Sequence, residues 1–477
     1  MAGKTKQGLL AQELSDLNPW WRSDSWSATD RDLQAARGSG LGYTAGALDD
    51  LEPGGLYVLR GPRRVGKTVV AKQAIDSLIE SGVPRLAIVR FAADGMSASD
   101  IRSIVQNVTL PRPPEGIERW WFIDEISGAT GEWAKTIKWL RDNLPSFGDG
   151  TVVLTGSNAE ALTEAIGEWP GRRGRIVNPD RTLLPIGFRT FARLLLPEPP
   201  PAGLRLGLAD LRTSVARDAF QALVPWLADL VRSWDTYLAY GGFPIAAAAA
   251  KRGEPIPEWF VNDIFTVIFK DVFGESRASG TTIMNMFARF MEGMASPVNL
   301  TSIAEDSEVS RPTVTRHLDY LRNGYLAWAC PQRSEKRWLA LPGSQPKIYA
   351  LDPLVARLSH LRNPARDDVD VTVLNEMMVG MALRRASVAA GHDWEGDDRV
   401  FHWRTPARKE IDFISELLVD VAIEGKFVDD GGWKAEARTV EASDWRGLLA
   451  TRSVLDTSDE DEAWAVPSAI LAYLVDI

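Results

Sequence analysis

Short apolar runs alternate with stretches of helical periodicity from about residue 54 to residue 193. Strands and helices that alternate in this way form α/β domains with a parallel sheet. Each run is long enough for one buried strand. The predicted strands cover residues 56–59, 86–91, 120–125, 151–158 and 181–188.

The first apolar run leads into a glycine-rich loop and then into a helix. Residues 61–68 read Gly-Pro-Arg-Arg-Val-Gly-Lys-Thr, which fits the phosphate-binding pattern G-x-x-x-x-G-K-T. Strand, loop and helix N-terminus aim backbone N–H groups at a polyphosphate, whereas a chance glycine turn would not have both flanks. Lys67 would reach the β- and γ-phosphates of ATP, and Thr68 would offer its hydroxyl to Mg²⁺. The residues expected to bind ATP are Gly61, Pro62, Arg63, Arg64, Val65, Gly66, Lys67, Thr68 and Val69.

Two acids end the third predicted strand. Ligands of parallel sheets bind at the carboxyl ends of the strands, which is where Asp124 and Glu125 lie. We expect Asp124 to hold Mg²⁺ through water and Glu125 to orient or deprotonate the attacking water. The fourth strand ends in Asn158, which resembles a sensor residue that contacts the γ-phosphate or the lytic water. The alternative for all three positions is an ordinary polar strand end.

Three arginines stand among glycines at residues 167–175. Arg172, Arg173 and Arg175 cannot form a core. They either belong to a solvated surface loop or act as arginine fingers on a γ-phosphate, in one version across a subunit boundary. The sequence leaves both interpretations open, with Arg172 and Arg173 ahead of Arg175.

A proline-rich stretch at residues 196–203 separates the α/β part from a helical part. Its prolines predict stiff, extended chain and therefore a boundary or an insertion. Residues 204–295 have helical periodicity and are expected to form a lid beside the nucleotide domain. Residues 1–50 are polar and rich in tryptophan, and we favour packing onto the next domain over contact with adenine.

Residues 296–356 have the pattern of a winged helix-turn-helix domain. Ser310 is a suitable N-cap for a recognition helix at 311–321, and β-like runs at 325–329 and 347–351 would form the wing. Arg311 and Arg316 on this helix, with Lys336 and Arg337 in the wing, are the expected DNA contacts. The alternative is a winged helix that docks only on protein. The local excess of basic residues comprises Arg311, Arg316, Arg322, Arg333, Lys336, Arg337 and Lys347 against Asp319 and Glu335.

The last predicted domain carries acids and a lysine in the pattern D…E-x-K. Asp412 lies on one apolar run, and Glu424 and Lys426 lie on the next, so a hairpin would bring them together. Carboxylate oxygens suit Mg²⁺ or Mn²⁺, and a neighbouring lysine can orient a water. Glu376, on a preceding helix, is the expected helper. The alternative is a structural salt bridge in a domain without chemistry.

Composition fits a soluble globular protein of about three domains. The chain has 477 residues, of which 45% are hydrophobic and 25% charged. Cys330 is the only cysteine, which excludes a disulfide framework and suits a reducing cytoplasm. We expect neither a secretion signal nor a membrane span, because no window is long and apolar enough. The net charge of −10 argues against a generally basic nucleic-acid coat but allows a local basic patch.

The order of these motifs resembles that of a mostly uncharacterised family of bacterial and archaeal P-loop ATPases. Its members are similar to AAA+ proteins and carry a C-terminal winged helix and a restriction-endonuclease-like domain of the PD-(D/E)xK type. The resemblance implies an AAA+ core sheet with strand order 5-1-4-3-2. The matching segments are Asn-Pro-Trp-Trp at 18–21, the P-loop, Phe-Ile-Asp-Glu at 122–125, Leu-Thr-Gly-Ser at 154–157, Gly-Arg at 171–172, Pro-Ile-Gly-Phe at 185–188, Tyr-Gly-Gly-Phe-Pro at 240–244, Trp-Arg at 403–404, Glu-Ile-Asp-Phe at 410–413 and Ile-Glu-Gly-Lys at 423–426.

Two segments depart from that family's pattern. The loop at 167–175 is richer in glycine and arginine than the family's usual Gly-Arg, which leaves the finger unassigned. The strand at 423–426 keeps the acid and the lysine but lacks the family's usual proline and valine.

These patterns together predict an α/β multidomain protein. We expect an N-terminal flank at 1–50, an AAA+-type P-loop core at 51–195, a helical lid at 196–295, a winged helix at 296–365 and a nuclease-like domain at 366–477. The predicted activity is Mg²⁺-dependent hydrolysis of ATP coupled to DNA engagement, by a cytoplasmic homo-oligomer that could be a ring. Branched and single-stranded DNA are candidate partners, and the C-terminal acids are a candidate nuclease site with Mg²⁺ or Mn²⁺.

A second class of function stays open at this point. A signalling or assembly ATPase would use the winged helix and the C-terminal domain to bind protein and would touch no nucleic acid. Salt-dependent DNA binding separates the two classes, because phosphate contacts release counterions.

Overall fold

The computed structural model describes residues 12–107, 110–271, 279–391, 399–405, 409–429 and 432–476. The chain forms two compact units, which we call the first and the second unit. The first comprises residues 1–184 with 323–325, and the second comprises residues 185–322 with 326–477. The main boundary therefore follows residue 184, whereas the sequence predicted it at residue 195.

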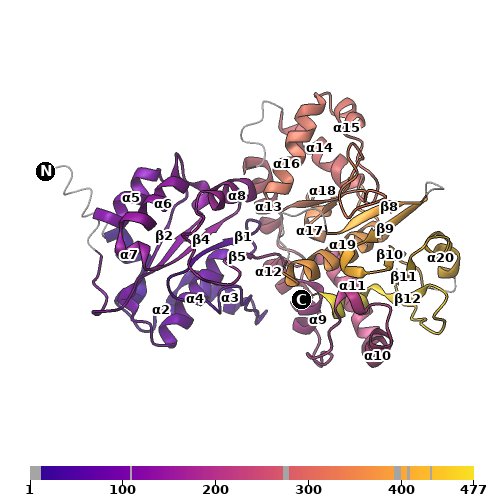
Figure 1. The fold of residues 1–477 in the computed structure, drawn as a ribbon, viewed down its shortest axis with the longest axis horizontal. Helices are drawn as coiled ribbons and strands as arrows, with labels where there is room; N and C mark the ends of the chain where they lie inside the picture. The colour runs from indigo at the N-terminus through magenta and orange to yellow at the C-terminus, as the bar shows by residue number, and fades with distance from the viewer. Residues whose placement is uncertain are drawn as a thin grey trace. The chain divides into compact units, whose positions relative to one another are not determined.

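The first unit is built on a parallel five-stranded sheet (Figure 1). Its strands are β1 Leu56–Arg60, β2 Ile88–Ala92, β3 Trp120–Asp124, β4 Thr151–Gly156 and β5 Asp180–Thr182. They lie in the order β2-β3-β4-β1-β5, which confirms the predicted order 5-1-4-3-2. Parallel sheets are buried on both faces, which accounts for the continuous apolar runs in the sequence.

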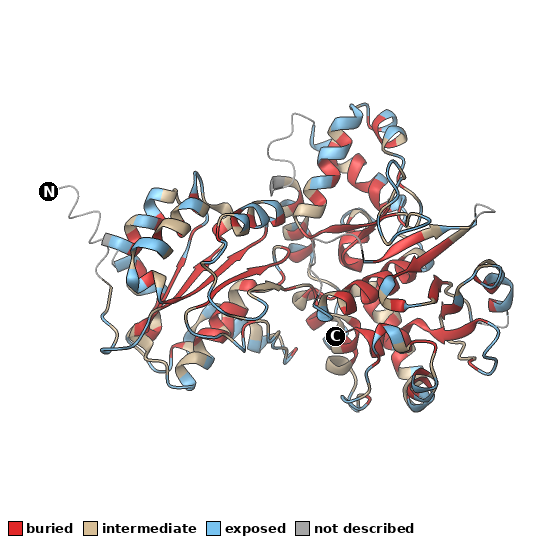
Figure 2. Cartoon of the chain, in the orientation of Figure 1, coloured by how far each residue is buried: buried red, intermediate tan, exposed pale blue. Residues whose placement is uncertain are grey.

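Helices cover both faces of this sheet. They are α4 Lys67–Glu80, α5 Ala98–Asn107, α6 Trp133–Asn143, α7 Pro145–Gly148 and α8 Ala159–Gly167. Val152 belongs to the hydrophobic cluster that includes residues of α5, α6 and α8, whereas its neighbour Val153 belongs to the cluster that includes residues of α4. Successive residues of a strand point to opposite faces, so the buried strands supply both clusters (Figure 2).

The N-terminal segment packs onto the edge strand β2. Asn18 is fully buried; its Oδ1 accepts from Arg90 N at 2.6 Å and its Nδ2 donates to Arg90 O at 2.8 Å. The indole N–H groups of Trp20 and Trp21 donate to Ile88 O at 3.1 and 2.8 Å. The contacts cover the backbone of an edge strand, in keeping with the packing interpretation. The segment continues through α2 Trp26–Thr29 and α3 Arg31–Gly38.

Helices form the first part of the second unit. They are α9 Phe188–Leu195, α10 Ser214–Ala222, α11 Leu227–Tyr240, α12 Pro244–Arg252, α13 Glu258–Asp271 and α14 Gly280–Glu292. Arg189 of α9 donates from Nη1 to the backbone oxygen of Tyr473, at 2.7 Å, in the C-terminal helix α21 Ser468–Val475. The helices predicted as a lid of the nucleotide domain thus group with the C-terminal end of the chain.

Two helices and two strands of the second unit lie where the sequence predicted a winged helix-turn-helix domain. The helices are α15 Leu300–Asp306 and α16 Arg311–Asn323, and the strands are β6 Ala327–Cys330 and β7 Lys347–Ala350. Ser310 acts as the expected cap, because its Oγ accepts from Thr313 N at 3.4 Å. Strands β6 and β7 pair antiparallel, with Cys330 opposite Lys347. Two short helices follow, α17 Pro353–Ala356 and α18 Leu358–Arg362.

A second five-stranded sheet completes the chain, in the order β12-β11-β10-β9-β8. Its strands are β8 Phe401–Arg404, β9 Glu410–Ile414, β10 Val421–Gly425, β11 Arg446–Thr451 and β12 Trp464–Pro467. The first three pair antiparallel and the last three pair parallel. Strands β9 and β10 form the predicted hairpin.

Helices pack on both faces of this second sheet. Helix α19 Val371–Ala389 lies so close to β10 that a Cβ atom on Gly425 would meet Cα of Glu376 at 2.9 Å. Helix α20 Trp433–Glu441 packs on the other face, where Ala437 shares a hydrophobic cluster with Ile414. The approach of α19 brings Glu376 to the carboxyl end of β10.

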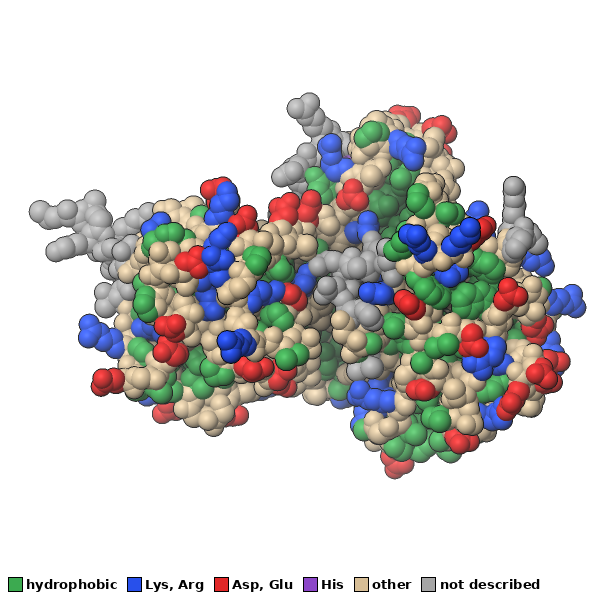
Figure 3. Space-filling view, in the orientation of Figure 1, with side chains coloured by type: hydrophobic (Ala, Val, Ile, Leu, Met, Phe, Trp, Pro, Cys, Tyr) green, Lys and Arg blue, Asp and Glu red, His purple; other side chains and the backbone are tan. Residues whose placement is uncertain are grey.

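Basic and acidic side chains are interspersed on the face drawn in Figure 3, as expected for a chain of net charge −10. Among the described helices, none combines the length and apolarity that crossing a bilayer requires.

We predict that Asn18→Ala lowers the free energy of unfolding by about 2–3 kcal/mol, because it leaves buried polar groups of Arg90 without partners. Urea denaturation measures the change. Asn143→Ala is the matched control, since the Asn143 side chain is exposed and donates only to Trp139 O within its own helix. Equal losses for the two variants would contradict the role of Asn18 at the sheet edge.

Candidate functional site

Three residues of the P-loop have a positive φ, and two of them are the glycines of its motif. Gly61, Arg64 and Gly66 have φ values of +150°, +66° and +104°. A Cβ atom on Gly61 would lie 2.0 Å from Leu183 O, so only glycine fits this position. Helix α4 begins directly after the loop, and its N-terminal N–H groups and dipole therefore face the loop.

Lys67 is held over the loop by backbone oxygens. Its Nζ donates to Gly61 O at 2.8 Å and to Pro62 O at 2.9 Å. Burial lowers the pKa of Lys67 to about 8, against the opposing effect of Glu125 and Asp124. The ammonium therefore lies beside the loop and within the electrostatic influence of both predicted catalytic acids.

Asp124 is the meeting point of three strands and the P-loop helix. Its Oδ2 accepts from Thr68 Oγ1 at 2.9 Å and from Arg90 Nη2 at 2.6 Å, and its Oδ1 accepts from Thr155 Oγ1. Burial alone would raise the pKa of Asp124, but Arg90 and the hydroxyl donors lower it overall. Asp124 is thus an ionised carboxylate next to the Thr68 hydroxyl, a pair of oxygens that suits Mg²⁺.

Glu125 has a left-handed backbone, with φ +52° and ψ +48°. A residue other than glycine rarely adopts this conformation, and such strain gathers at functional sites. Its Oε1 accepts from Ser127 Oγ at 3.1 Å, from Ser157 N at 3.2 Å and from Ser157 Oγ. Its backbone N donates to Thr155 Oγ1 at 2.9 Å. The carboxylate is therefore fixed in direction as well as in position.

Asn158 has a structural contact of its own. It is exposed, and its Oδ1 accepts from Ala161 N at 3.0 Å, which caps helix α8. The Glu125 carboxylate instead accepts from the neighbour of Asn158, Ser157, which directly follows β4. The sensor role of Asn158 stays a prediction.

The arginine loop is tied to the start of β1. Arg172 Nε lies 2.7 Å from Asp142 Oδ1, and Arg173 binds both carboxylate oxygens of Asp180 at 2.6 and 3.0 Å. Arg173 O also accepts from Leu56 N, at the end of β1 that is opposite the P-loop. Arg175 is exposed. Within one chain Arg173 is thus a structural residue, and a finger that acts across a subunit boundary stays a prediction.

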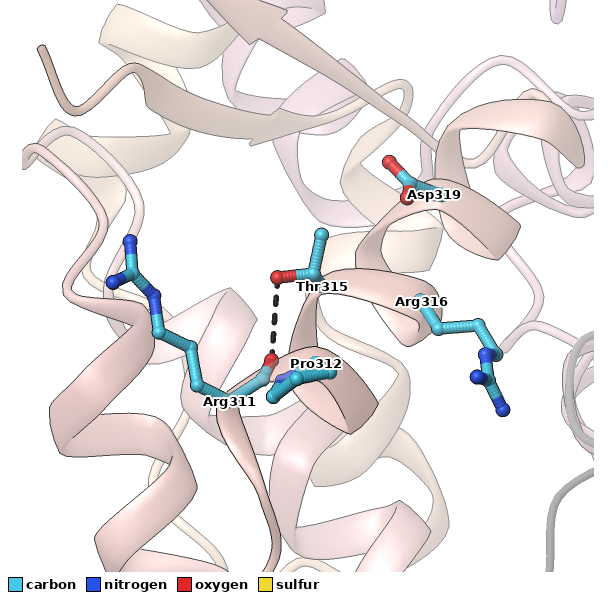
Figure 4. A pocket seen from close by; sticks show the side chains of 5 residues that line it. All are labelled: Arg311, Pro312, Thr315, Arg316 and Asp319. Carbon is cyan, nitrogen blue, oxygen red and sulfur yellow. Dashed lines mark hydrogen bonds between the residues drawn. The ribbon is translucent and has the colours of Figure 1, made fainter. Parts of the chain in front are cut away.

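Two of the residues predicted to contact DNA lie on an exposed side of α16 (Figure 4). Arg311 and Arg316 extend in different directions from the helix, and Thr315 Oγ1 between them donates to Arg311 O at 3.2 Å. Lys336 and Arg337 in the wing are exposed as well, so these four side chains are accessible to a partner. A shallow hollow on this side is lined by Arg311, Pro312, Thr315, Arg316 and Asp319.

Two basic residues counted in the predicted patch are not placed for phosphate contacts. Arg333 stacks its guanidinium 4.1 Å from the centre of the Trp338 ring. Lys347 is fully buried and paired with acids, so the prediction that it adds to a basic surface is wrong. The sequence shows that Lys347 is basic. It does not show that Lys347 is buried, because the burial depends on α19 and β9, which come later in the chain.

The predicted C-terminal residues come together as expected from the hairpin. Lys426 Nζ lies 3.1 Å from Glu424 Oε2 and 3.5 Å from Asp412 Oδ2. Asp412 Oδ2 also accepts from Gly425 N at 3.0 Å. Glu376 approaches from α19, on which it was predicted.

Lys347 is the member of this cluster that the sequence did not reveal. Its Nζ lies 3.0 Å from Glu376 Oε1, 2.8 Å from Glu410 Oε1 and 2.9 Å from Asp412 Oδ1. Tyr349, two residues further along β7, donates from its hydroxyl to Glu376 Oε1 at 2.6 Å. We call the six charged residues the carboxylate–lysine centre; they are Lys347, Glu376, Glu410, Asp412, Glu424 and Lys426.

Burial and neighbouring charges shift the pKa values in this centre in opposite directions. Burial alone would raise the pKa of Asp412, but Lys347 and Lys426 hold it well below its usual range. Burial and the charge of Asp412 raise the pKa of Glu376 to about 7 and also raise the pKa of Glu424. Asp412 is therefore the carboxylate that carries the charge for both lysines.

The centre as it stands does not fit the predicted divalent ion at Asp412 and Glu424. Oxygens of Glu376, Glu410 and Asp412 already converge on Lys347 Nζ. Within the described ranges, no group of three or more His, Cys, Asp or Glu side chains is arranged to hold a metal ion.

Comparison with known protein families finds a similar domain for most of the first unit. Residues 54–192 match the family model of an AAA domain. The match includes Lys67, Asp124 and Glu125, and at the level of the family it supports a P-loop ATPase. Residues 231–364 match the model of a domain of unknown function, DUF8612, and no curated protein matches the chain.

Solved structures show only distant likeness. The Walker-type ATPase PABY2304 of Pyrococcus abyssi is 13% identical over 69% of this chain and 95% of its own, with a TM-score of 0.33. The Aeropyrum pernix ORC1 protein in complex with DNA is 14% identical over 72% and 97%, with a TM-score of 0.28. A point variant of Thermotoga maritima RuvB is 13% identical over 63% and 88%, with a TM-score of 0.26. TM-scores this low carry no argument about this chain.

We predict that Thr155→Val lowers ATP turnover by about 10-fold to 100-fold while ATP still binds, because its hydroxyl positions both Asp124 and Glu125. Steady-state kinetics, with fluorescent-nucleotide binding alongside, measure both effects. Thr151→Val is the matched control, since that hydroxyl is buried on the same strand but accepts from Gly54 N at the other end of the sheet. Equal turnover in the two variants would remove Thr155 from the site.

Proposed function

We propose that the first unit binds ATP with Mg²⁺ and hydrolyses it. The observation that carries this proposal is the meeting of Thr68, Asp124 and Glu125 beside a P-loop whose Lys67 amino group lies over the loop. Lys67 and the N-terminal N–H groups of α4 would bind the phosphates. Mg²⁺, where bound, would neutralise charge on the β- and γ-phosphate oxygens, next to Thr68 and Asp124.

Glu125 is the residue that we assign to the attacking water. Three donors from Ser127 and Ser157 hold its Oε1, which leaves its direction set before a substrate arrives. A carboxylate held in this way can orient a water and accept its proton. Asn158 remains our candidate for contact with the γ-phosphate or that water.

We also propose that ATP turnover is coupled to DNA engagement by the winged helix. Arg311 and Arg316 on α16, with Lys336 and Arg337 in the wing, are exposed basic residues on a helix-turn-helix scaffold. They favour phosphate contacts with little sequence preference. A winged helix that docks on protein in a signalling or assembly ATPase is the second candidate, and the same exposed residues serve it.

Homo-oligomerisation would give the arginine loop a catalytic role. Arg173 is tied down within its own chain, whereas Arg175 is exposed. One of Arg172, Arg173 and Arg175 would then reach the γ-phosphate of a neighbouring subunit, in a ring or another arrangement.

We propose a restriction-endonuclease-like fold for the last domain. A mixed sheet with Asp412 and Glu424 on a hairpin, Lys426 beside them and Glu376 on the preceding helix supports that fold proposal. We do not extend it to cleavage, because Lys347 occupies the position between the acids.

The ATPase proposal predicts that Lys67→Ala loses ATP binding and that Glu125→Gln retains binding but turns over about 10²-fold to 10⁴-fold more slowly. The glutamine keeps the shape of the side chain and loses the base. Nucleotide binding and phosphate release measure the two steps. Wild-type turnover by Glu125→Gln would refute the role of Glu125.

Coupling to DNA predicts a higher ATPase rate with one of single-stranded, duplex or branched DNA than without it. Arg311→Ala with Arg316→Ala should weaken DNA binding and reduce its salt slope by about 2, one for each lost phosphate contact. Arg232→Ala with Arg252→Ala, two exposed arginines on α11 and α12, is the control. An unchanged salt slope, with no DNA effect on ATP turnover, would favour the protein-docking candidate.

A further inference from the structure

The side chain of Lys347 reaches from strand β7 to acids of the last domain. Lys347 is the first residue of β7, where it pairs with Cys330 of β6, and its side chain ends among acids of α19 and β9. The residue is fully buried. Tyr349, two positions along the strand, points to the same cluster and donates to Glu376. The wing strand is therefore also a wall of the carboxylate–lysine centre.

The ammonium of Lys347 is saturated by the acids around it. An ammonium has three N–H donors, and Lys347 Nζ has an oxygen of Glu376, Glu410 and Asp412 within 3.0 Å. These three oxygens belong to three different carboxylates and come from a helix and a strand. A divalent ion takes its oxygens from carboxylates that converge in the same way. Lys347 Nζ lies where such an ion would lie.

The acids of the centre exceed its lysines. Four carboxylates face two ammonium groups, and the Arg404 guanidinium meets only Glu410, at 3.4 Å. Glu424 is 1% exposed, and its Oε1 has no hydrogen-bond partner among the residues that the structure describes. An oxygen without a partner in a buried acid is costly, so Glu424 Oε1 has room for one further donor or cation.

We propose that Lys347 is a built-in cation that keeps a divalent-metal site of the Mg²⁺ or Mn²⁺ class closed. Glu376, Glu410, Asp412 and Glu424 supply the oxygens of that latent site, and β7 of the wing carries the group that fills it. Metal enters only when Lys347 leaves. This inference is independent of ATP hydrolysis in the first unit and of DNA binding by α16.

Calorimetry with MnCl₂ on the full chain tests the closed state directly. Wild type and Asp412→Asn should give the same heats, because Mn²⁺ has no access to Asp412 while Lys347 is in place. Any Mn²⁺ binding at the P-loop is common to both proteins and cancels. A binding event in wild type that Asp412→Asn removes would overturn the proposal.

Lys347→Met tests the latent site, since methionine keeps the apolar stem and removes the charge. This variant should gain one Mn²⁺ per chain, and adding Asp412→Asn should remove the gain. Lys426→Met removes a lysine from the same centre, but one that is partly exposed and touches only Asp412 and Glu424, so it should gain nothing. No gain in folded Lys347→Met, or an equal gain in Lys426→Met, would overturn the proposal. Circular dichroism establishes whether each variant folds. If Lys347→Met does not fold, the comparison of wild type with Asp412→Asn still tests whether Lys347 keeps Mn²⁺ away from Asp412.

Discussion

A carboxylate that is removed from water needs a cation beside it, and both units of this protein depend on that constraint. Arg90 meets Asp124 in the first unit, and Lys347 meets Asp412 in the second. Loss of one partner of a buried pair leaves an uncompensated charge, so such pairs hold together the elements that carry them. They join Arg90 of β2 to Asp124 of β3 near the P-loop, and Lys347 of β7 to Asp412 of β9.

The two pairs differ in whether the aspartate can still exchange its hydrogen-bond partners for a ligand. Arg90 shares Asp124 Oδ2 with the Thr68 hydroxyl, a neutral donor that can exchange partners at modest cost. Asp124 Oδ2 can therefore exchange the Thr68 hydroxyl for another partner. Lys347 has an acid for each of its three donors, so its ammonium group fills the position between those acids. In our proposals, the pair of Arg90 and Asp124 leaves a site open to a ligand, whereas Lys347 fills the site at Asp412.

The sequence predicted the groups of residues that lie close together along the chain. It did not predict the contacts that depend on which distant strands become neighbours. The P-loop is eight consecutive residues, and the hairpin of Asp412 and Glu424 follows from strand alternation. Arg90 and Asp124 are 34 positions apart, and Lys347 and Asp412 are 65 apart. Their contacts depend on which strands become neighbours, and the basic charge of Lys347 looks the same in the sequence as that of exposed Lys336. The AAA match and the confirmed strand order leave the roles of Asn158 and the arginine loop as predictions.

The N-terminal cover of β2 has a consequence for any attempt to isolate the AAA domain. The family match begins at residue 54, whereas the backbone of the edge strand is capped by Asn18, Trp20 and Trp21. A fragment cut at the family boundary would present a bare strand edge and an uncovered apolar surface. Exposed edges of this kind pair with other chains. Such a fragment would aggregate through β2, although it would contain every residue that we propose to bind nucleotide.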